Sequence, residues 1–427
     1  MKNGLKSIVA LVAMMGLVGC GGTSESEAQP TEPPLSADFK AGFILVGDEN
    51  EGYSEAHING INAAAEKLGL SSSQIIMKKK VEENDSAKTA AEDLVSSGCS
   101  LVVSNSYGHQ SYMADAAKEH EDVQFVAATG DFAAISGVSN LNNAFTNVYE
   151  ARYVSGIVGG MKLKELIESN KLTDANKDEH GNYKIGYVGA YTYAEVISGY
   201  TAFFLGVQSI VPHVMMEVQF TSSWFDIDKE AAAAETLINR GCVIIGQHAD
   251  SSGAPSKCES MLAAGKQCYS VGYNVDMLSV APNAALTSAT NNWEVYYEYA
   301  LKSAMEGKDI DVDWSRGYSD GAVGITELGK SCAAGTAEKV KEVEDALKAG
   351  TFHVFDTSKF TVEGKKVTSN VVDFSYLDFT TTPPTVVYQG EKKETVKTAG
   401  DVSYVEESVI RSAPYFSLKI DGITWLN

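Results

Sequence analysis

The fold is decided by residues 41–69, which read AGFILVGDENEGYSEAHINGINAAAEKLG. The stretch begins with a continuous apolar run, Ala41–Val46, as is typical of a strand buried on both faces. A polar turn follows at 47–52, and apolar residues then recur with helical spacing until Gly69 ends the pattern. A strand, a turn and a helix in this order predict one β–α unit of a parallel sheet.

The same alternation continues along the chain. It gives predicted strands at 75–81, 101–103 and 123–127 and predicted helices at 86–97 and 110–120. A second series, opened by an apolar-faced helix at 149–164, has strands at 185–188, 214–220, 243–246 and 270–272 and helices at 194–206, 228–239 and 256–264. Two such series predict an α/β fold of two Rossmann-like lobes.

The position of a ligand follows from this architecture. Parallel α/β sheets bind ligands outside the carboxyl ends of their strands, so two facing lobes place the cleft between them and suit hinge closure.

From about residue 352 the character of the sequence changes. Short strand-like pieces at 371–376, 385–388 and 415–420 lie among Lys, Thr and Gly. We expect a β-rich C-terminal extension on the second lobe.

The N-terminus indicates the compartment. Lys2 and Lys6 precede an apolar run at 8–18, which is too short to span a bilayer core of roughly 20 apolar residues but suits a signal peptide. The run ends in Leu-Val-Gly before Cys20, as at bacterial lipoprotein cleavage sites. We therefore expect a signal peptide at 1–19, lipidation of Cys20 and a flexible polar tether up to residue 36, with the protein anchored on the extracytoplasmic face of the cell membrane. An ordinary secretory signal with a chance cysteine is the alternative.

Composition excludes several classes of function. A net charge of −22 opposes nucleic-acid binding, which needs clustered Lys and Arg. No catalytic motif, phosphate loop or zinc-ligand spacing is present, so neither an enzyme nor a cofactor or metal site is expected. Besides Cys20 there are five cysteines, an odd number, so at least one lacks an intramolecular partner. Cys258 and Cys268 are close enough in sequence to close one short loop through a disulfide, but buried free thiols are an equal alternative.

Several short stretches, in their order and spacing, carry a family resemblance. They are residues 47–69, 149–162 (YEARYVSGIVGGMK), 184–206, 223–226 (SWFD), 247–250 (QHAD), 271–276 (VGYNVD) and 286–297 (LTSATNNWEVYY). Over about residues 41–355 the chain resembles the basic membrane lipoprotein family, which includes purine-nucleoside-binding lipoproteins.

The resemblance implies a periplasmic binding protein fold of type I with three interlobe crossings, near 140–147, 287–293 and 309–318. Lobe one would then comprise 37–145 plus 290–312, and lobe two 146–289 plus 313–427 with the extension. It also implies a substrate-binding protein that passes a small molecule to the permease of an ABC importer.

The family's ligand contacts are implied only where residues match. Asp48 stands where an acidic residue of the first loop hydrogen-bonds the base, and Tyr53 keeps the following aromatic, but Ser54 replaces an asparagine. Trp224, two residues before Asp226, matches an aromatic of the second lobe. Two aromatics from opposite lobes can sandwich a flat heterocycle, and base stacking is worth about 1–3 kcal/mol.

The sugar end departs from the nucleoside binders. Asn274 stands where they have an aspartate, although Asp276 matches the second aspartate of that motif. Asn291 and Asn292, followed by Trp293, stand where they have a lysine. The loss of both charges weakens the case for ribose and leaves room for a free nucleobase or another flat polar molecule.

Position along the predicted strands adds further candidates. Tyr107, His109 and Asp250 closely follow strands and Trp293 lies at a crossing, so each could face the cleft. Each also has a structural alternative, such as hinge packing for Trp293 or a surface role for His109. We thus expect a lipid-anchored importer subunit that binds a purine base or nucleoside. A surface sensor or adhesin with the same cleft is the alternative.

Overall fold

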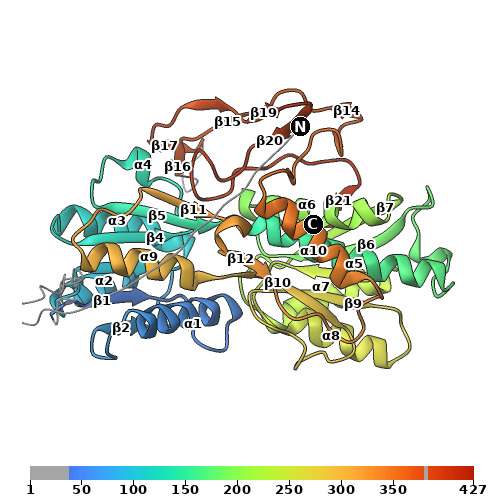
Figure 1. The fold of residues 1–427 in the computed structure, drawn as a ribbon, viewed down its shortest axis with the longest axis horizontal. Helices are drawn as coiled ribbons and strands as arrows, with labels where there is room; N and C mark the ends of the chain where they lie inside the picture. Colours follow the sequence, from blue (N-terminus) through green and yellow to red (C-terminus); the bar gives the residue numbers. More distant parts are fainter. Residues whose placement is uncertain (1–37, 379–382) are drawn as a thin grey trace, which may run out of the picture. The chain divides into compact units, whose positions relative to one another are not determined.

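The computed structural model describes residues 38–378 and 383–427, of which residues 38–427 form one compact unit. The predicted signal peptide, Cys20 and most of the tether lie outside the described residues. Two sheets carry the fold (Figure 1). The first has the order β11-β5-β4-β3-β1-β2, with every neighbouring pair parallel. Its strands are β1 (Ala41–Ile44), β2 (Ile75–Lys78), β3 (Leu101–Ser104), β4 (Gln124–Ala128), β5 (Leu141–Thr146) and β11 (Asp313–Arg316).

Helices cover both faces of the first sheet (Figure 1). They are α1 (Gly52–Lys67), α2 (Ser86–Ser96), α3 (Gln110–Glu119), the short α4 (Ala133–Ser136) and α9 (Trp293–Met305), with a 3₁₀ turn at Tyr107–His109. The start of α1 is fixed by Glu51, whose carboxylate accepts from the backbone N–H of Tyr53 and Ser54. The loop between β1 and α1 is thereby held in one conformation.

The second sheet has the order β12-β10-β9-β8-β6-β7-β21, parallel except for β12 against β10. Its strands are β6 (Tyr183–Gly189), β7 (Val214–Phe220), β8 (Ile244–Gln247), β9 (Tyr269–Tyr273), β10 (Ala285–Asn291), β12 (Val323–Ile325) and β21 (Ile423–Trp425). Its helices are α5 (Val148–Glu168), α6 (Ala194–Ile210), α7 (Ile227–Asn239), α8 (Gly253–Ala263) and α10 (Thr336–Lys348). The two-lobed α/β fold expected from the sequence is confirmed.

Helices α5 and α6 meet backbone to backbone. A Cβ atom added at Gly156 would lie 2.2 Å from the carbonyl oxygen of Phe203, and one at Gly206 would lie 2.2 Å from that of Tyr153. Only glycine therefore fits at these two positions. The close contact fixes α6, whose first residues reach the cavity described below.

The chain passes between the sheets three times: from β5 to α5, from β10 to α9, and from β11 to β12. Strand β11 pairs with Asn143–Thr146 of β5, so the first sheet extends beyond residue 312, where the predicted border of lobe one lay. The physical reason is Trp314, which is buried and packs against Tyr296 of α9 with ring centroids 4.9 Å apart.

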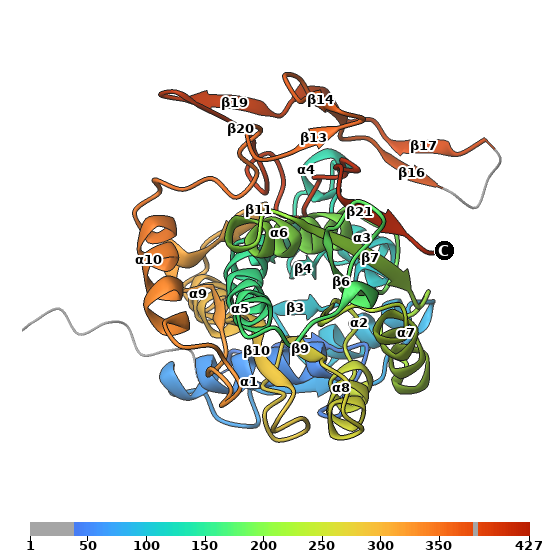
Figure 2. The ribbon, with the colours of Figure 1, turned by 90° about the vertical axis from the view of Figure 1, so that its right-hand side faces the viewer.

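The C-terminal extension is β-rich, as expected. It contains four two-stranded pairs: β13 (Thr361–Val362) with β14 (Lys365–Lys366), β15 (Val371–Asp373) with β18 (Lys392–Glu394), β16 (Tyr376–Asp378) with β17 (Thr385–Tyr388), and β19 (Val396–Ala399) with β20 (Val402–Val405). These pairs lie together above α4 and α6 (Figure 2).

Two expectations about the extension were wrong. Residues 415–420 form no strand, although Tyr415 and Phe416 are buried, because they belong to an irregular segment described below. The extension is also not confined to the second lobe. While β21 is an edge of the second sheet, the Tyr376 and Tyr388 rings lie 4.6 and 5.0 Å from the Phe132 ring of the first lobe.

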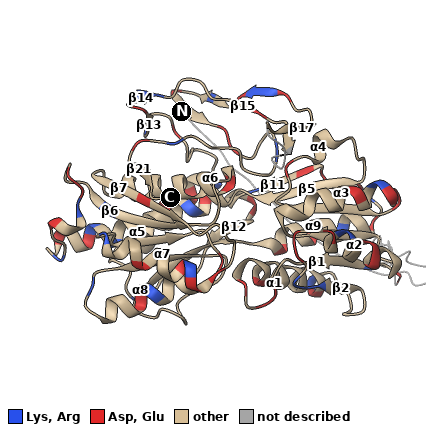
Figure 3. Cartoon of the chain, turned by 180° about the vertical axis from the view of Figure 1, so that it is seen from behind, with Lys and Arg blue, Asp and Glu red and all other residues tan. Residues whose placement is uncertain are grey.

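Charged residues are distributed over both lobes. In the view of Figure 3, both Lys or Arg and Asp or Glu are found on helices of each lobe. Within the described part of the chain, no helix combines the length and apolar character needed to cross a membrane.

Candidate ligand-binding site

A cavity of about 740 Å³ lies where the strands of both sheets end. Its walls come from the loops after β1, β2, β3 and β4, from the loops after β6, β7 and β8, from the ends of strands β5 and β9, and from the extension. Parallel α/β sheets bind ligands at this edge, and small-molecule pockets have volumes of about 300–1,000 Å³. Both the position and the size of the cavity therefore suit a small organic molecule.

Aromatic side chains dominate the lining. They are Tyr53, Tyr107 and Phe145 from the first lobe and Tyr191, Tyr193, Trp224, Phe225 and Tyr273 from the second. Tyr107 and Tyr193 meet across the lobes with ring centroids 5.6 Å apart. Trp224 meets Tyr191 edge to face at 4.9 Å. The pattern of the sequence singled out Tyr53, Tyr107 and Trp224 but missed Tyr191 and Tyr193, which follow the buried strand β6.

The loop after β1 carries a charged carboxylate into this cavity. Asp48 lies 2.7 Å from Lys80 and accepts from the backbone and the side-chain N–H of Asn50. The contact with Lys80, followed by those with Asn50, lowers the pKa of Asp48 to about 2. Asp48 is therefore an anionic acceptor at any physiological pH.

The neighbouring residues of this loop have different roles. Tyr53 lines the cavity, and its hydroxyl donates to the carbonyl oxygen of Asn105 at 2.8 Å, which fixes the ring. Ser54 is buried and does not line the cavity. Its hydroxyl oxygen accepts from Gly47 N and from Asn105 Nδ2, so Ser54 holds the loop in place.

Asp250, which follows β8, is the second carboxyl group of the cavity. It is buried, and Oδ1 accepts from Asn274 Nδ2 at 2.8 Å. Burial, reinforced by the nearby carboxylates of Glu51, Glu230 and Glu195, raises the pKa of Asp250 well above its ordinary value. A protonated carboxyl both donates and accepts, whereas Asp48 only accepts. The carbonyl oxygen of Asp250 also accepts from Gly52 N at 3.2 Å and so joins the two lobes.

A buried polar chain that the sequence did not reveal runs along the second lobe. Arg152 Nη1 donates to the carbonyl oxygen of Gln247, and its guanidinium lies 3.5 Å from the centroid of the Tyr273 ring. Arg152 Nη2 faces His248 Nδ1 at 3.3 Å, and His248 Nε2 lies 2.7 Å from Glu195 Oε2.

This arrangement assigns the tautomer of His248. Because Nδ1 faces an arginine donor, Nδ1 is the acceptor and Nε2–H donates to Glu195. Burial lowers the pKa of His248, which agrees with a neutral ring. Glu195 Oε1 is buried without a hydrogen-bond partner in the described part of the chain, and Glu195 lines the cavity. In the sequence, the polar residues Gln247 and His248 of the stretch 247–250 (QHAD) were the signal that could have revealed this buried chain.

Besides Ser54, four expected site residues lie outside the cavity lining. His109 does not reach the cavity; it is buried with Nε2 3.0 Å from the carbonyl oxygen of Val81, and burial lowers its pKa. Asn274, Asp276 and Trp293 line a second cavity of about 640 Å³, which shares Asn50 and Asp250 with the first. Trp293 is 1% exposed and stacks on His57 at 4.0 Å, so it mainly packs the start of α9.

The asparagines singled out in the sequence form one network. Asn291 Nδ2 donates to Asn274 Oδ1 at 2.9 Å and to the Tyr273 hydroxyl at 3.2 Å, and Asn291 Oδ1 accepts from the Thr146 hydroxyl. Their side chains therefore satisfy one another inside the protein. No group of three or more His, Cys, Asp or Glu side chains is placed to hold a metal ion within residues 38–378 and 383–427.

Several known proteins are similar to this chain. A purine-binding protein of Brucella abortus is 28% identical over 320 residues, covering 74% of this chain and 83% of that protein. A putative ABC transporter glucose-binding protein of Haloferax volcanii is 25% identical, covering 80% of this chain and 81% of its own. A solved ABC transporter solute-binding protein from Aeropyrum pernix shares the fold, with a TM-score of 0.60 at 14% identity over 73% of this chain and 92% of its own.

The family model described as "ABC transporter substrate-binding protein PnrA-like" matches residues 40–354, which is most of the folded unit. Members of this family bind solutes for ABC transporters and are not enzymes. The chain belongs to the family of PnrA-like substrate-binding proteins of ABC transporters.

Proposed function

We propose that the protein binds a purine in the 740 Å³ cavity and hands it to the permease of an ABC importer. The observation that carries the proposal is the set of flat aromatic side chains that face one cavity from both lobes, beside the two carboxyl groups of Asp48 and Asp250. Tyr53 and Tyr107 belong to the first lobe, and Tyr193 and Trp224 to the second.

The chemistry of a purine fits this lining. Each aromatic face that stacks on a base contributes about 1–3 kcal/mol, largely independently of the base. Hydrogen bonds then select the orientation: Asp48 accepts from a ring N–H or amino group, and Asp250, whose pKa is raised by burial, can donate to a ring nitrogen when it holds a proton. The similarity to a purine-binding protein of Brucella abortus supports the same ligand class.

We further propose that a free base is preferred to a nucleoside. In proteins that resemble this chain, a charged aspartate and lysine serve the sugar, whereas here Asn274 and Asn291 are neutral and bonded to each other. A ribose would find no charged partner at these positions. The glucose-binding relative from Haloferax volcanii makes a hexose the competing ligand, because aromatic faces also pack on sugar rings.

We propose that the mature protein is attached to the outer face of the cell membrane through a lipid on Cys20. The proposal rests on the apolar run that ends in Leu-Val-Gly before Cys20, which lies outside the described residues. Metabolic labelling with a fatty acid tests it, because Cys20→Ser must abolish the incorporated label and release the protein from membranes. Retention of label in Cys20→Ser would refute the anchor.

The ligand is tested by a thermal-shift screen of the chain from Ser36, which keeps the whole compact unit 38–427. The panel contains adenine, hypoxanthine, their nucleosides, uracil and glucose. A ligand that binds only the folded state stabilises it by about 2.7 kcal/mol at one hundred times Kd. We expect the midpoint to rise with free purines only. An equal rise with nucleosides would contradict the interpretation of the two asparagines, and a rise with glucose alone would replace the purine with a sugar.

Permease genes beside the gene for this protein separate import from a sensor or adhesin that uses the same cavity. We expect adjacent genes for a permease and an ATPase. Their absence, together with unchanged uptake of labelled purine in a deletion strain, would favour the sensor or adhesin.

A further inference from the structure

The C-terminal extension supplies one wall of the cavity. The segment 405–416, which follows β20, places Arg411, Ala413 and Pro414 in the lining. The family match ends at residue 354, so this wall lies outside the part of the chain that the family describes. The ligand of this protein therefore meets a surface that belongs to the extension.

A buried carboxylate fastens this segment to the second lobe. Glu407 accepts from the Ser198 hydroxyl of α6 at 3.1 Å and from the backbone N–H groups of Tyr415 and Phe416 at 2.6 and 2.8 Å. The Phe416 ring stacks on Phe355 with centroids 4.1 Å apart. Both ends of the segment are thus held at the same point of the lobe.

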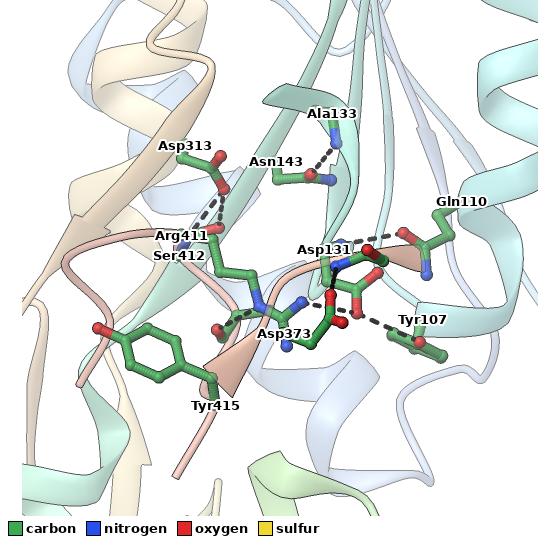
Figure 4. A network of polar contacts seen from close by, with 12 residues as sticks. Tyr107, Gln110, Asp131, Ala133, Asn143, Asp313, Asp373, Arg411, Ser412 and Tyr415 are labelled. Atoms are coloured by element: carbon green, nitrogen blue, oxygen red, sulfur yellow. Dashed lines mark hydrogen bonds and ion pairs between the residues drawn. The ribbon is translucent and has the colours of Figure 1, made fainter. Parts of the chain in front are cut away.

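The middle of the segment is fastened to the first lobe. Ser412 donates from its backbone N and its hydroxyl to Asp313 Oδ1, each at 3.0 Å (Figure 4). Asp313 begins strand β11 of the first sheet. The segment therefore contacts both lobes on either side of the cavity. Arg411, which lies between the anchoring residues Glu407 and Ser412, lines the cavity itself.

Arg411 is held in a defined orientation. Its Nη1 lies 3.3 Å from Asp131 Oδ2, and its Nε donates to the carbonyl oxygen of Ala413 at 3.3 Å. Figure 4 shows the guanidinium directed toward Asp131, with Tyr107 on the other side of that carboxylate. The Tyr107 hydroxyl donates to the same Oδ2 at 3.4 Å, and Asp131 N donates to Gln110 Oε1 at 2.9 Å. Asp131 is therefore fixed from both sides.

One atom of this cluster lacks a partner. Asp131 Oδ1 is buried and accepts no hydrogen bond from any described residue, although Asp131 lines the cavity. A buried carboxylate oxygen without a donor is unfavourable, so a ligand N–H or O–H that reaches it gains a strong hydrogen bond. A guanidinium has five N–H donors, so Arg411 can keep its contacts and still donate to an acceptor on the same ligand.

We propose that Arg411 is a specificity-determining residue of the ligand pocket and that, together with Asp131, it recognises a ligand edge on which a hydrogen-bond donor stands beside an acceptor. Adenine has such an edge in its 6-amino group and N1, and hypoxanthine has one in N1–H and O6. 1-Deazapurine has the same ring skeleton but neither a donor nor an acceptor at this edge. The choice of purines rests on the function proposed above.

The test is a calorimetric titration of the chain from Ser36 with adenine, hypoxanthine and 1-deazapurine. Arg411→Gln removes the planar N–H donors and the charge of the guanidinium. Arg316→Gln is the matched control, since Arg316 pairs with Asp311 and Asp320 outside the cavity. We expect Arg411→Gln to raise Kd for adenine and hypoxanthine roughly 10- to 100-fold and to leave 1-deazapurine within about twofold. Arg316→Gln should leave all three unchanged.

A structural role for Arg411 would weaken all three ligands alike and would overturn the proposal, as would equal affinities of Arg411→Gln and Arg316→Gln. Asp131→Asn provides a second variant that keeps the shape of the side chain, and it should show the same selective loss. If the wild-type protein binds none of the purines, the proposed function fails by itself. The inference is then tested with the compound that a general metabolite screen identifies, and an unchanged Kd in Arg411→Gln overturns it.

Discussion

The side-chain amide of Asn291 donates a hydrogen bond to Oδ1 of Asn274 at 2.9 Å, and Asn274 Nδ2 donates one to Asp250 Oδ1 at 2.8 Å. Asn274 has a φ of 63°, in the left-handed region that asparagine tolerates better than most residues. The end of β9 is thus shaped around a neutral pair of amides. Through Asn274, the two amides are hydrogen-bonded to Asp250 of the cavity, and they add no charge to the cavity.

The amide network predicts a specific loss of stability. Asn291→Leu keeps the branched shape of the side chain but leaves Asn274 Oδ1 and the Thr146 hydroxyl without their partner in the protein interior. A buried polar group without a partner costs about 1–3 kcal/mol, so the free energy of unfolding should fall by at least about 2 kcal/mol in urea denaturation. Asn292→Leu is the control because Asn292 is exposed. Equal losses in both variants would contradict the network's role.

The aromatic lining predicts a loss of ligand affinity with an unchanged fold. Trp224 is half-buried and faces the cavity, so Trp224→Ala should weaken purine binding by about 1–3 kcal/mol, measured by calorimetry. Trp224→Phe keeps a flat ring and should recover most of the affinity. If Trp224→Ala binds as tightly as the wild type, the stacking partner is another ring of the lining, and the role proposed for Trp224 is wrong.

The sequence predicted the parallel strands because their pattern is simple. Strand β7, Val214–Phe220, has the predicted bounds. Strand β10 was not predicted, because residues 286–290 are a run of Leu, Thr, Ser, Ala and Thr with few large apolar side chains. The Thr287 hydroxyl donates to the carbonyl oxygen of Thr326, and the Thr290 hydroxyl donates to that of Asn274. Conversely, the apolar residues at 415–420 resemble a strand but are held as a loop by Glu407.

Candidate site residues were predicted where they follow a strand in sequence. Asp48, Tyr53, Tyr107, Trp224 and Asp250 all line the cavity. Arg411 could not be found in this way. Its contact with Asp131 joins two segments far apart in the chain, and the local periodicity of the sequence does not indicate such a contact. His109 illustrates the opposite error, since it follows a strand but its ring turns into the protein toward Val81.

The state of the cysteines gives a further prediction. The five cysteines of the described residues, Cys99, Cys242, Cys258, Cys268 and Cys332, are free. Burial raises the pKa of Cys99 and of Cys332 to about 11, and the thiolate is the reactive form. The native chain from Ser36 should therefore react slowly with Ellman's reagent at pH 8, and the chain unfolded in guanidinium chloride should release five equivalents at once. Three equivalents would indicate a disulfide, with Cys258 and Cys268 the pair to examine by peptide mapping.

Three buried glutamates predict how stability depends on pH. Burial raises the pKa of Glu150, Glu230 and Glu407 to about 7, above the ordinary value of 4.5 that each regains on unfolding. The folded protein therefore holds these protons more tightly than the unfolded chain. Their contribution to stability is fully present below about pH 4.5 and is lost as the pH rises to about 7. The free energy of unfolding should accordingly be lower at pH 8 than at pH 5.

Glu150→Gln isolates one of these groups. Glu150 Oε2 accepts from Tyr318 N at 2.7 Å, and the glutamine side-chain oxygen can keep this bond while it cannot ionise. The variant should lose less stability than the wild type between pH 5 and pH 8, by on the order of 3 kcal/mol. The exposed Glu66→Gln serves as the control and should follow the wild type. The same pH dependence for Glu150→Gln and Glu66→Gln in urea denaturation would contradict this prediction. Glu150 would then be ionised in the folded protein at neutral pH, and its burial at the passage from β5 to α5 would make no pH-dependent contribution to the free energy of unfolding.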